Sequence, residues 1–155
     1  MDIRELRGAL GCFPTGVMVI TASSEGMEHG MTANSFTSVS LVPPLILVCI
    51  DNNARMARLL ERGMHFGLSI LSAGQEKVSR HFAGQGASAG EVQFTWRSGI
   101  PFIGNAAASF LCRATECHVT GDHTVYLAEV EHFERSGLPP LVFCAGRYLV
   151  PETRP

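Results

Sequence analysis

Small uncharged polar side chains are concentrated in one short segment, residues 32–41, between two apolar stretches of the chain. The segment contains Thr32, Asn34, Ser35, Thr37, Ser38 and Ser40. Binding pockets orient flat heteroaromatic ligands with a few hydroxyl and amide groups placed among apolar ones. The segment therefore predicts a neutral wall that hydrogen-bonds the polar edge of such a ligand. The alternative interpretation is a Ser/Thr-rich edge strand that runs into a turn.

A second group of residues has the side chains that zinc takes as ligands. Cys112, Cys117, His118 and His123 together offer two thiolates and two imidazoles, which are common donors of tetrahedral zinc sites. Side chains alternate between the two faces of a strand, and positions 112 and 117 differ by an odd number. On one regular strand the two cysteines would face opposite sides, so their spacing argues against a shared metal ion.

Other catalytic patterns are weak. No serine lies on a predicted strand-to-helix elbow of the hydrolase type, and no G-x-G-x-x-G motif follows a strand and opens a helix. Gly121-Asp122-His123 lies between two predicted strands and reads first as an ordinary turn, because Gly and Asp both favour turns.

The composition limits the kinds of partner. A length of 155 residues fits one domain, residues 1–155, that buries a core without disulfides or metals. Hydrophobic residues make up 46% of the chain and charged residues 17%, so a second copy of the chain is expected to cover apolar surface, as a homodimer. The net charge of -2 leaves no basic stripe for nucleic acid.

Signals for secretion or membrane insertion are weak as well. The five cysteines are odd in number and form no C-x-x-C pair, which indicates reduced thiols rather than a disulfide framework. Charged residues interrupt the N-terminal segment before it could act as a signal peptide. The longest apolar stretch, residues 41–50, is too short to span a bilayer. We expect a cytoplasmic protein without membrane contacts.

The elements that must position these residues follow from periodicity and chain breakers. Ile3, Leu6 and Leu10 share one helical face, and Gly11 and Pro14 end that helix. Strands are predicted over residues 17–21, 31–36, 45–50, 64–71, 107–117, 118–133 and 141–149, and helices over residues 54–60 and 73–82. Many short strands with brief helices favour a mainly β, α+β fold, a β-barrel with peripheral helices. The Gly-rich stretch of residues 83–100 is predicted to be a loop, suited to a mobile lid over a pocket.

Several segments, in order along the chain, resemble the short-chain flavin reductases, the reductase components of two-component flavin-dependent monooxygenases. Residues 13–21 are similar to the opening strand of that family, and residues 30–41 with Pro43-Pro44-Leu45 resemble its flavin-binding signature. Gly121-Asp122-His123-Thr124, followed by residues 127–130, resembles a third block, and Arg147-Tyr148 resembles a fourth. The resemblance runs through nearly the whole chain.

This resemblance implies a split β-barrel of the FMN-binding type, assembled as a homodimer with flavin near the subunit interface. It implies an NAD(P)H:flavin oxidoreductase that transfers hydride from NADH or NADPH to FMN or FAD and hands reduced flavin to a separate oxygenase. Because the flavin supplies the redox chemistry, the protein has only to bind it, orient it and exclude water. A wall of neutral hydrogen-bonding groups suits that task.

The resemblance also assigns site residues. His123 is the expected catalytic residue, hydrogen-bonded to the nicotinamide cofactor, with Tyr148 closing over the same side and Asp122 shaping the turn. The other expected cofactor-binding residues are Thr15, Thr32, Ala33, Asn34, Ser35, Ser38, Cys49, Ile50, Asp51, Arg55, Ser79, Arg80, His81 and Phe82. Relatives often have a hydroxyl residue after the strand at 45–50, whereas residues 52–56 here read Asn-Asn-Ala-Arg-Met. The phosphate of the flavin then falls to Arg55, Lys77, Ser79, Arg80 or His81, aided by helix N-termini.

Two other functions fit the same residues. A non-catalytic flavin-binding module would lack productive nicotinamide binding, and Gly121-Asp122-His123 and Arg147-Tyr148 argue against it. An oxidoreductase that retains its flavin and acts on a metal complex or an organic substrate is the second alternative.

Overall fold

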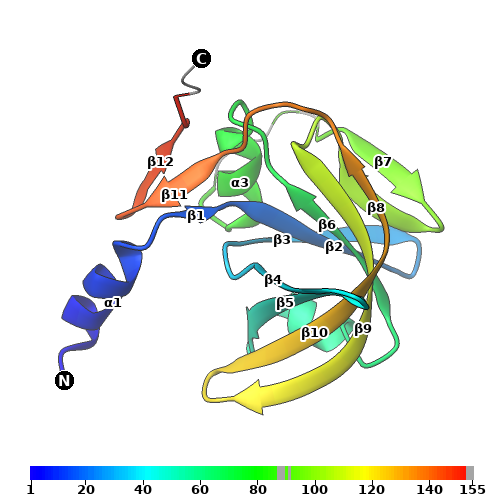
Figure 1. Ribbon diagram of the computed structural model, residues 1–155, viewed down its shortest axis with the longest axis horizontal. Helices are drawn as coiled ribbons and strands as arrows, with labels where there is room; N and C mark the ends of the chain where they lie inside the picture. Colours follow the sequence, from blue (N-terminus) through cyan, green and yellow to red (C-terminus); the bar gives the residue numbers. More distant parts are fainter. Residues whose placement is uncertain (87–89, 91, 153–155) are drawn as a thin grey trace.

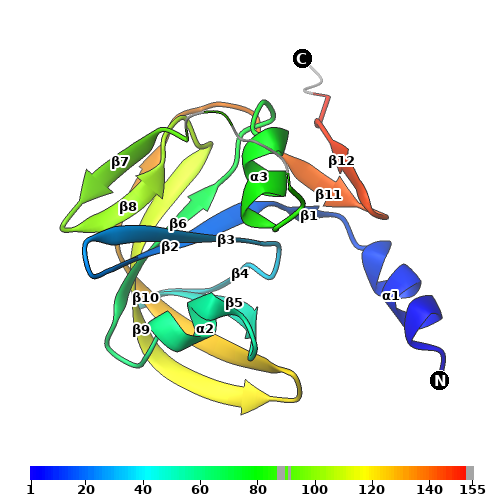
Figure 2. The ribbon, with the colours of Figure 1, turned by 180° about the vertical axis from the view of Figure 1, so that it is seen from behind.

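A seven-stranded antiparallel sheet organises the molecule, in the order β3-β2-β6-β9-β10-β5-β4 (Figures 1 and 2). The structure is a computed structural model that describes residues 1–86, 90 and 92–152. The strands of this sheet are β2 (Met18–Ser24), β3 (Met27–Ala33), β4 (Thr37–Leu41), β5 (Pro44–Asp51), β6 (His65–Ile70), β9 (Ala108–Thr120) and β10 (His123–Arg135). β3 and β4 therefore lie at the two ends of the sheet, and β9 lies at its centre.

Two smaller sheets flank the large one. β1 (Thr15–Gly16), β11 (Val142–Cys144) and β12 (Arg147–Leu149) form the first, and β7 (Phe94–Arg97) pairs with β8 (Ile100–Ile103) in the second. The β11–β12 turn has positive φ at Ala145 (48°) and Gly146 (76°). A two-residue hairpin loop of this kind requires positive φ at both central residues, and glycine adopts it without a steric penalty.

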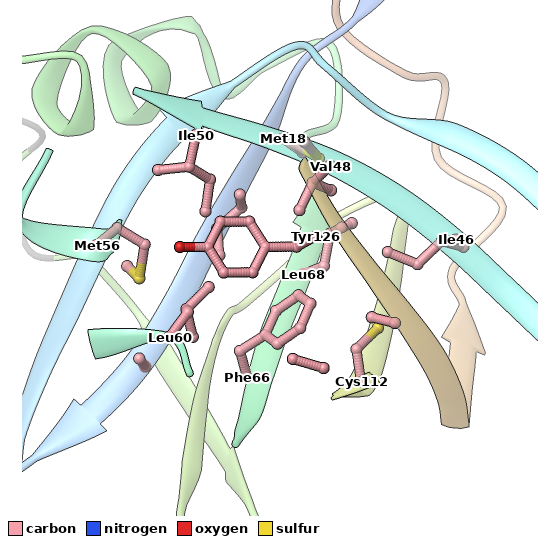
Figure 3. Close-up of a cluster of buried hydrophobic side chains, with 14 residues drawn as sticks. Met18, Ile46, Val48, Ile50, Met56, Leu60, Phe66, Leu68, Cys112 and Tyr126 are labelled. Atoms are coloured by element: carbon pink, nitrogen blue, oxygen red, sulfur yellow. The ribbon is translucent and has the colours of Figure 1, made fainter. Parts of the chain in front are cut away.

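A buried apolar cluster lies between the large sheet and the short helix α2 (Arg55–Leu59). Figure 3 shows the ring of Tyr126 at its centre, among side chains from β5, β6 and α2. The Tyr126 hydroxyl donates to the carbonyl of Ala57 at 3.3 Å, so the one polar atom of this ring is satisfied. A second cluster, built on Val17, Val19, Leu71, Ile103 and Leu141, underlies helix α3 (Glu76–Phe82).

Helix α1 (Ile3–Gly11) stands away from the body of the molecule (Figures 1 and 2). The Asp2 side chain caps it by accepting a hydrogen bond from the backbone N–H of Arg4 at 2.7 Å. None of its residues is buried, and Ile3 and Leu10 on its apolar face are 65% and 67% exposed. A helix this short is marginal in water without tertiary packing.

The mainly β, split-barrel type of fold that the sequence predicted is confirmed, with differences in detail. The strand expected over residues 31–36 begins earlier and ends at Ala33, and β4 follows as an edge strand, which was the alternative interpretation of this segment. The boundary expected at residue 117 lies inside β9, because the chain turns only at Gly121 and Asp122.

The loop predicted over residues 83–100 is wrong in its second half, where the β7–β8 hairpin forms. Ser98 and Gly99 have the positive φ values, 50° and 76°, of a tight hairpin turn. The part of this stretch to which the lid hypothesis applies includes residues 87–89 and 91, which lie outside the described residues.

Candidate functional site

A cleft opens where the start of β2, the end of β3, α3 and the β11–β12 hairpin meet. One side of it is a cavity of about 180 Å³ lined by Thr32, Ala33, Asn34, Ser79, Tyr148 and their neighbours. The other side is a cavity of about 230 Å³ lined by residues 13–18 together with Asn34, Phe36 and Ile70. Val17 and Asn34 line both cavities, which are therefore neighbours, and we refer to the two together as the cleft. Their combined volume falls in the range of small-molecule sites, about 300–1,000 Å³.

Neutral hydroxyl groups are linked across the cleft wall. The Thr32 hydroxyl donates to the carbonyl of Ser79 at 2.7 Å. The Ser79 hydroxyl lies 2.9 Å from the Tyr148 hydroxyl, which joins α3 to β12. The guanidinium of Arg80 lies over the Tyr148 ring, 4.9 Å from its centroid. These partly buried hydrogen bonds join uncharged groups and give the wall a fixed geometry, and the charged group that contacts it is Arg80.

Close packing of α3 on β3 sets the depth of the cleft. A Cβ atom at Gly30 would lie 2.6 Å from the Phe82 ring, so only glycine allows the ring to lie on the strand. The same packing buries Ser79 completely. Phe82 is therefore a support for the cleft wall, and its neighbour His81 contacts its ring edge-on with centroids 4.9 Å apart.

One buried polar atom in the cleft has no protein partner among the described residues. The Thr15 hydroxyl oxygen is buried without a hydrogen bond, and Thr15 lines the same cavity as Asn34. A buried hydroxyl left unpaired costs free energy, so such an atom commonly marks the position of a missing ligand or water. The cleft thus fits a ligand with a hydrogen-bonding edge.

Several residues that the sequence assigned to the ligand are not among those that line these two cavities. The Ser35 hydroxyl donates to the Cys49 carbonyl at 2.8 Å and accepts from the Cys49 N–H at 3.0 Å, so it fixes the backbone of β5. The Ile50 side chain is 1% exposed and packs in the core beside Tyr126 (Figure 3). Ser38 lies on β4 and lines an apolar groove that includes Phe133. Burial also raises the pKa of the Cys49 thiol.

A charged turn joins β9 to β10, separate from the residues that line the cleft. The Nδ1 atom of His123 lies 2.7 Å from a carboxylate oxygen of Asp122, and this hydrogen bond holds the pKa of Asp122 below its usual value. A carboxylate only accepts hydrogen bonds, so Nδ1 carries the proton and Nε2 is left for another partner. His123 lies opposite Asp51 in the strand register, which brings those two predicted residues together.

The predicted phosphate ligands are divided between two places. Arg55 begins α2, and its guanidinium lies 3.4 Å from Nε2 of His29 in a cavity of about 260 Å³. Arg80 is on α3, where it pairs with Glu76 at 2.8 Å and bonds the Gln85 side chain at 3.1 Å. A cation that already has a carboxylate partner is a weaker anion site, so Arg55 is the better placed of the two.

Cys112 and Cys117, the cysteines of the considered zinc set, lie in different surroundings. Cys112 is fully buried in the core, where burial and the charge of Glu131 raise the pKa of its thiol to about 12. Cys117 is exposed. Within the described residues there is no group of three or more potential metal ligands, and no helix there is long and apolar enough to cross a membrane.

The structure adds cleft residues that sequence reasoning missed. Val17, Phe143 and Gln85 line the cavity of Thr32 and Tyr148. Phe143 packs edge-on against Tyr148, with ring centroids 5.2 Å apart. The signal available for Phe143 was its place across a tight Ala145-Gly146 turn from Tyr148, but the short strands on either side gave little periodicity.

Known proteins are similar to this chain over most of its length. The profile of the Flavin reductase like domain matches residues 10–150. An NADH-dependent flavin reductase from Rhodococcus sp is 42% identical over 92% of this chain and 83% of its own length. An NADH-dependent FAD reductase from Streptomyces globisporus is 43% identical over 95% of this chain and 85% of its own length.

Solved structures agree as well. The flavin reductase PheA2 superposes with a TM-score of 0.94 and 40% identity, covering 99% of this chain and 100% of that one. BorF, the flavin reductase component of a bacterial two-component tryptophan halogenase, superposes with a TM-score of 0.88 and 36% identity, covering 99% of this chain and 100% of that one.

Proposed function

The chain belongs to the Flavin reductase like domain family, and from this premise we propose that its neutral cleft holds the flavin ring while its charged turn receives the nicotinamide cofactor. The protein is an NADH-dependent flavin reductase that passes hydride to FMN or FAD and supplies reduced flavin to a monooxygenase. The single observation that carries the proposal is the cleft itself, where hydroxyl groups and the unpartnered Thr15 oxygen surround a space of ligand size.

The cleft residues fit a flavin ring by their chemistry. When bound, the flavin supplies the hydride acceptor, so the protein needs no acid or base at that position. Asn34 and Thr15 offer hydrogen bonds to the polar edge of the ring, and Val17 offers an apolar surface. The Thr32–Ser79–Tyr148 linkage keeps that wall in one geometry, which matters because hydride transfer depends on the distance between two stacked rings.

The charged turn suits the nicotinamide cofactor for a different reason. Asp122 fixes the ring of His123 and its proton, so Nε2 is left as a hydrogen-bond acceptor for the incoming cofactor. The His123 side chain is 44% exposed and the Asp122 side chain 88%. An exposed site can bind and release a cofactor in every turnover. Tyr148 reaches the cleft from the other side and closes it.

We assign the phosphate of the flavin to Arg55. Arg55 is the first residue of α2, and its guanidinium contacts His29 beside an open cavity. A guanidinium presents several donors to a phosphate, and the Nε2 atom of His29 orients it by accepting one of its hydrogen bonds.

The homodimer that composition favoured is part of the proposal. The apolar face of α1 is uncovered, and an apolar groove of about 410 Å³ runs along β4, β5 and β10. Leu41 and Phe133, which line the groove, are 86% and 66% exposed. Apolar patches of this kind mark interaction surfaces in soluble proteins.

Phe133→Glu places a charge on this groove and is expected to shift the sedimentation of the protein toward the monomer. Val119→Glu, on an exposed part of β9, serves as the control. An unchanged dimer in Phe133→Glu counts against this surface.

Steady-state NADH oxidation with added FMN or FAD tests the function. We expect turnover only with added flavin, and its absence would contradict a reductase. His123→Ala is expected to raise the KM for NADH by about tenfold while the flavin Kd stays within about twofold. His118→Ala, which removes an exposed histidine from β9, is the matched control. Loss of flavin binding in His123→Ala would overturn the role given to the turn.

A further inference from the structure

Asn52 lies between the charged turn and the start of α2, and it contacts three residues of that turn. Its backbone N–H donates to the Asp122 carbonyl at 3.0 Å. Its side-chain Nδ2 donates to the Gly121 carbonyl at 3.2 Å, and its Oδ1 accepts from the Thr124 hydroxyl at 2.8 Å. These contacts fall on both sides of His123. We propose that Asn52 is a positioning residue for NADH use, which holds the His123 turn in register with the loop that leads to Arg55.

The other side of Asn52 is equally fixed. The Asp51 carboxylate accepts from the Asn53 N–H at 2.8 Å, and the Asp51 carbonyl accepts from the Ala54 N–H at 2.9 Å. These bonds close a tight loop that ends where Arg55 begins α2. The placement of His123 is therefore tied to the placement of Arg55 through the side chain of Asn52, in addition to the pairing of His123 with Asp51. This inference rests on the roles proposed above for His123 and Arg55.

The contacts explain why an amide is needed at position 52. Asn presents a donor and an acceptor on one planar group, and here the donor meets a carbonyl while the acceptor meets a hydroxyl. An aspartate would keep the bond from Thr124 but would set a carboxylate against the Gly121 carbonyl. The Asn52 contacts leave the imidazole of His123 uncovered, so the residue fixes the backbone of the turn while Asp122 fixes the ring.

The test is a double-mutant cycle read as NADH KM, kcat and flavin Kd. Asn52→Ala is expected to raise the KM for NADH about three- to tenfold and to leave the flavin Kd within about twofold, since small displacements of a positioned group are costly. In the His123→Ala background the same change is expected to alter KM by less than about twofold. Asn53→Ala is the control, because Asn53 contributes its backbone N–H, which alanine retains.

Further variants separate a positioning role from a purely structural one. Asn52→Asp keeps the acceptor and is expected to fall between Asn52→Ala and the natural protein in NADH KM. Thr124→Val removes the hydroxyl that reaches Oδ1 and is expected to raise the same KM by a smaller factor, with the Asn52 loop intact. An equal effect of Asn52→Ala with and without His123, or an unchanged KM in both Asn52→Asp and Thr124→Val, overturns the inference.

The outcome for His123 alone keeps the two proposals apart. If His123→Ala leaves the NADH KM unchanged, the role proposed for the turn fails. If His123→Ala raises that KM and Asn52→Ala does not, the proposed function stands and the inference about Asn52 fails.

Discussion

The cleft and the charged turn use polar groups in opposite ways. In the cleft, Thr32, Ser79 and Tyr148 are uncharged, hydrogen-bonded to one another and at least partly buried. In the turn, the Asp122 carboxylate accepts a hydrogen bond from His123, and both side chains are exposed to solvent. A buried hydrogen bond is costly to break, because it leaves a buried group unpaired, whereas an exposed polar pair contributes little to stability. The cleft is therefore built for orientation and the turn for exchange.

The largest effect is expected when the packing of α3 on β3, which supports the cleft wall, is disrupted. Gly30→Val would place a Cβ atom 2.6 Å from the Phe82 ring, which is closer than atoms in contact can lie. We expect the free energy of unfolding to fall by about 1–3 kcal/mol or more, with loss of flavin binding. Urea unfolding measures the first and fluorescence titration the second. Gly8→Ala, where an added Cβ meets nothing within 4 Å, should leave both unchanged or slightly improved. Normal flavin binding in Gly30→Val would contradict the cleft wall described above.

A smaller change removes one hydrogen bond of the wall. Thr32→Val keeps the shape of the side chain but leaves the Ser79 carbonyl without this donor. The flavin Kd is expected to rise about three- to tenfold and the free energy of unfolding to fall by about 1 kcal/mol. Titration with FMN and with FAD measures the first effect. Thr120→Val, on an exposed part of β9, is the control. Equal effects in the two variants would show that the hydrogen bond from Thr32 to Ser79 has no particular role in flavin binding.

The contribution of the charged turn to stability is expected to depend on pH. The hydrogen bond from His123 lowers the pKa of Asp122 from its ordinary value of 3.8. The pair therefore contributes its full stabilisation of the fold when the pH is above 3.8. The stabilisation is lost as the pH falls through the lowered pKa, because the carboxylate is then protonated in the folded protein as well. At pH 5 the urea midpoint of Asp122→Asn should lie below that of the natural protein. The difference between the two midpoints should become smaller as the pH falls from 5 to 3. Parallel curves for the two proteins would argue against the pair.

The smallest expected effect comes from the ion pair outside the cleft. Glu76→Gln removes the carboxylate that contacts Arg80 across one turn of α3, while Arg80 remains over the Tyr148 ring. Pairs at this spacing contribute about 0.3–0.5 kcal/mol, so unfolding and flavin Kd should change little. A large change in flavin Kd would show that Glu76 holds Arg80 in the site.

Sequence patterns predicted the elements that carry strong local signals. The spacing of Ile3, Leu6 and Leu10 predicted α1, continuous apolar runs predicted β2 and β5, and the strand character of residues 64–71 predicted β6, all of which are present. In those runs both faces of the strand are apolar, so the sequence did not show which face is buried. Ile50 illustrates this, because its side chain packs in the core with Ile46 and Val48, which lie four and two positions earlier.

The site was predictable where its residues are neighbours in sequence and less so where they meet across the fold. Thr32, Ala33 and Asn34 stood out as one neutral segment, and all of them line the cleft. The bond between Ser79 and Tyr148 joins residues 69 positions apart, and no local pattern reports such a contact. The hydroxyl of Ser35 is a further example, since Ser35 lies between β3 and β4 and its partner Cys49 lies on β5.

The position of β3 at the end of the large sheet predicts where the molecule opens locally. An outermost strand opens more readily than strands at the centre of a sheet, and β3 delivers Thr32 and Ala33 to the cleft. Its backbone amides should therefore exchange hydrogen for deuterium sooner than those of β9. A ligand in the cleft would slow that exchange, so the mass of a single peptide spanning residues 27–36 would report occupancy of the site without any turnover.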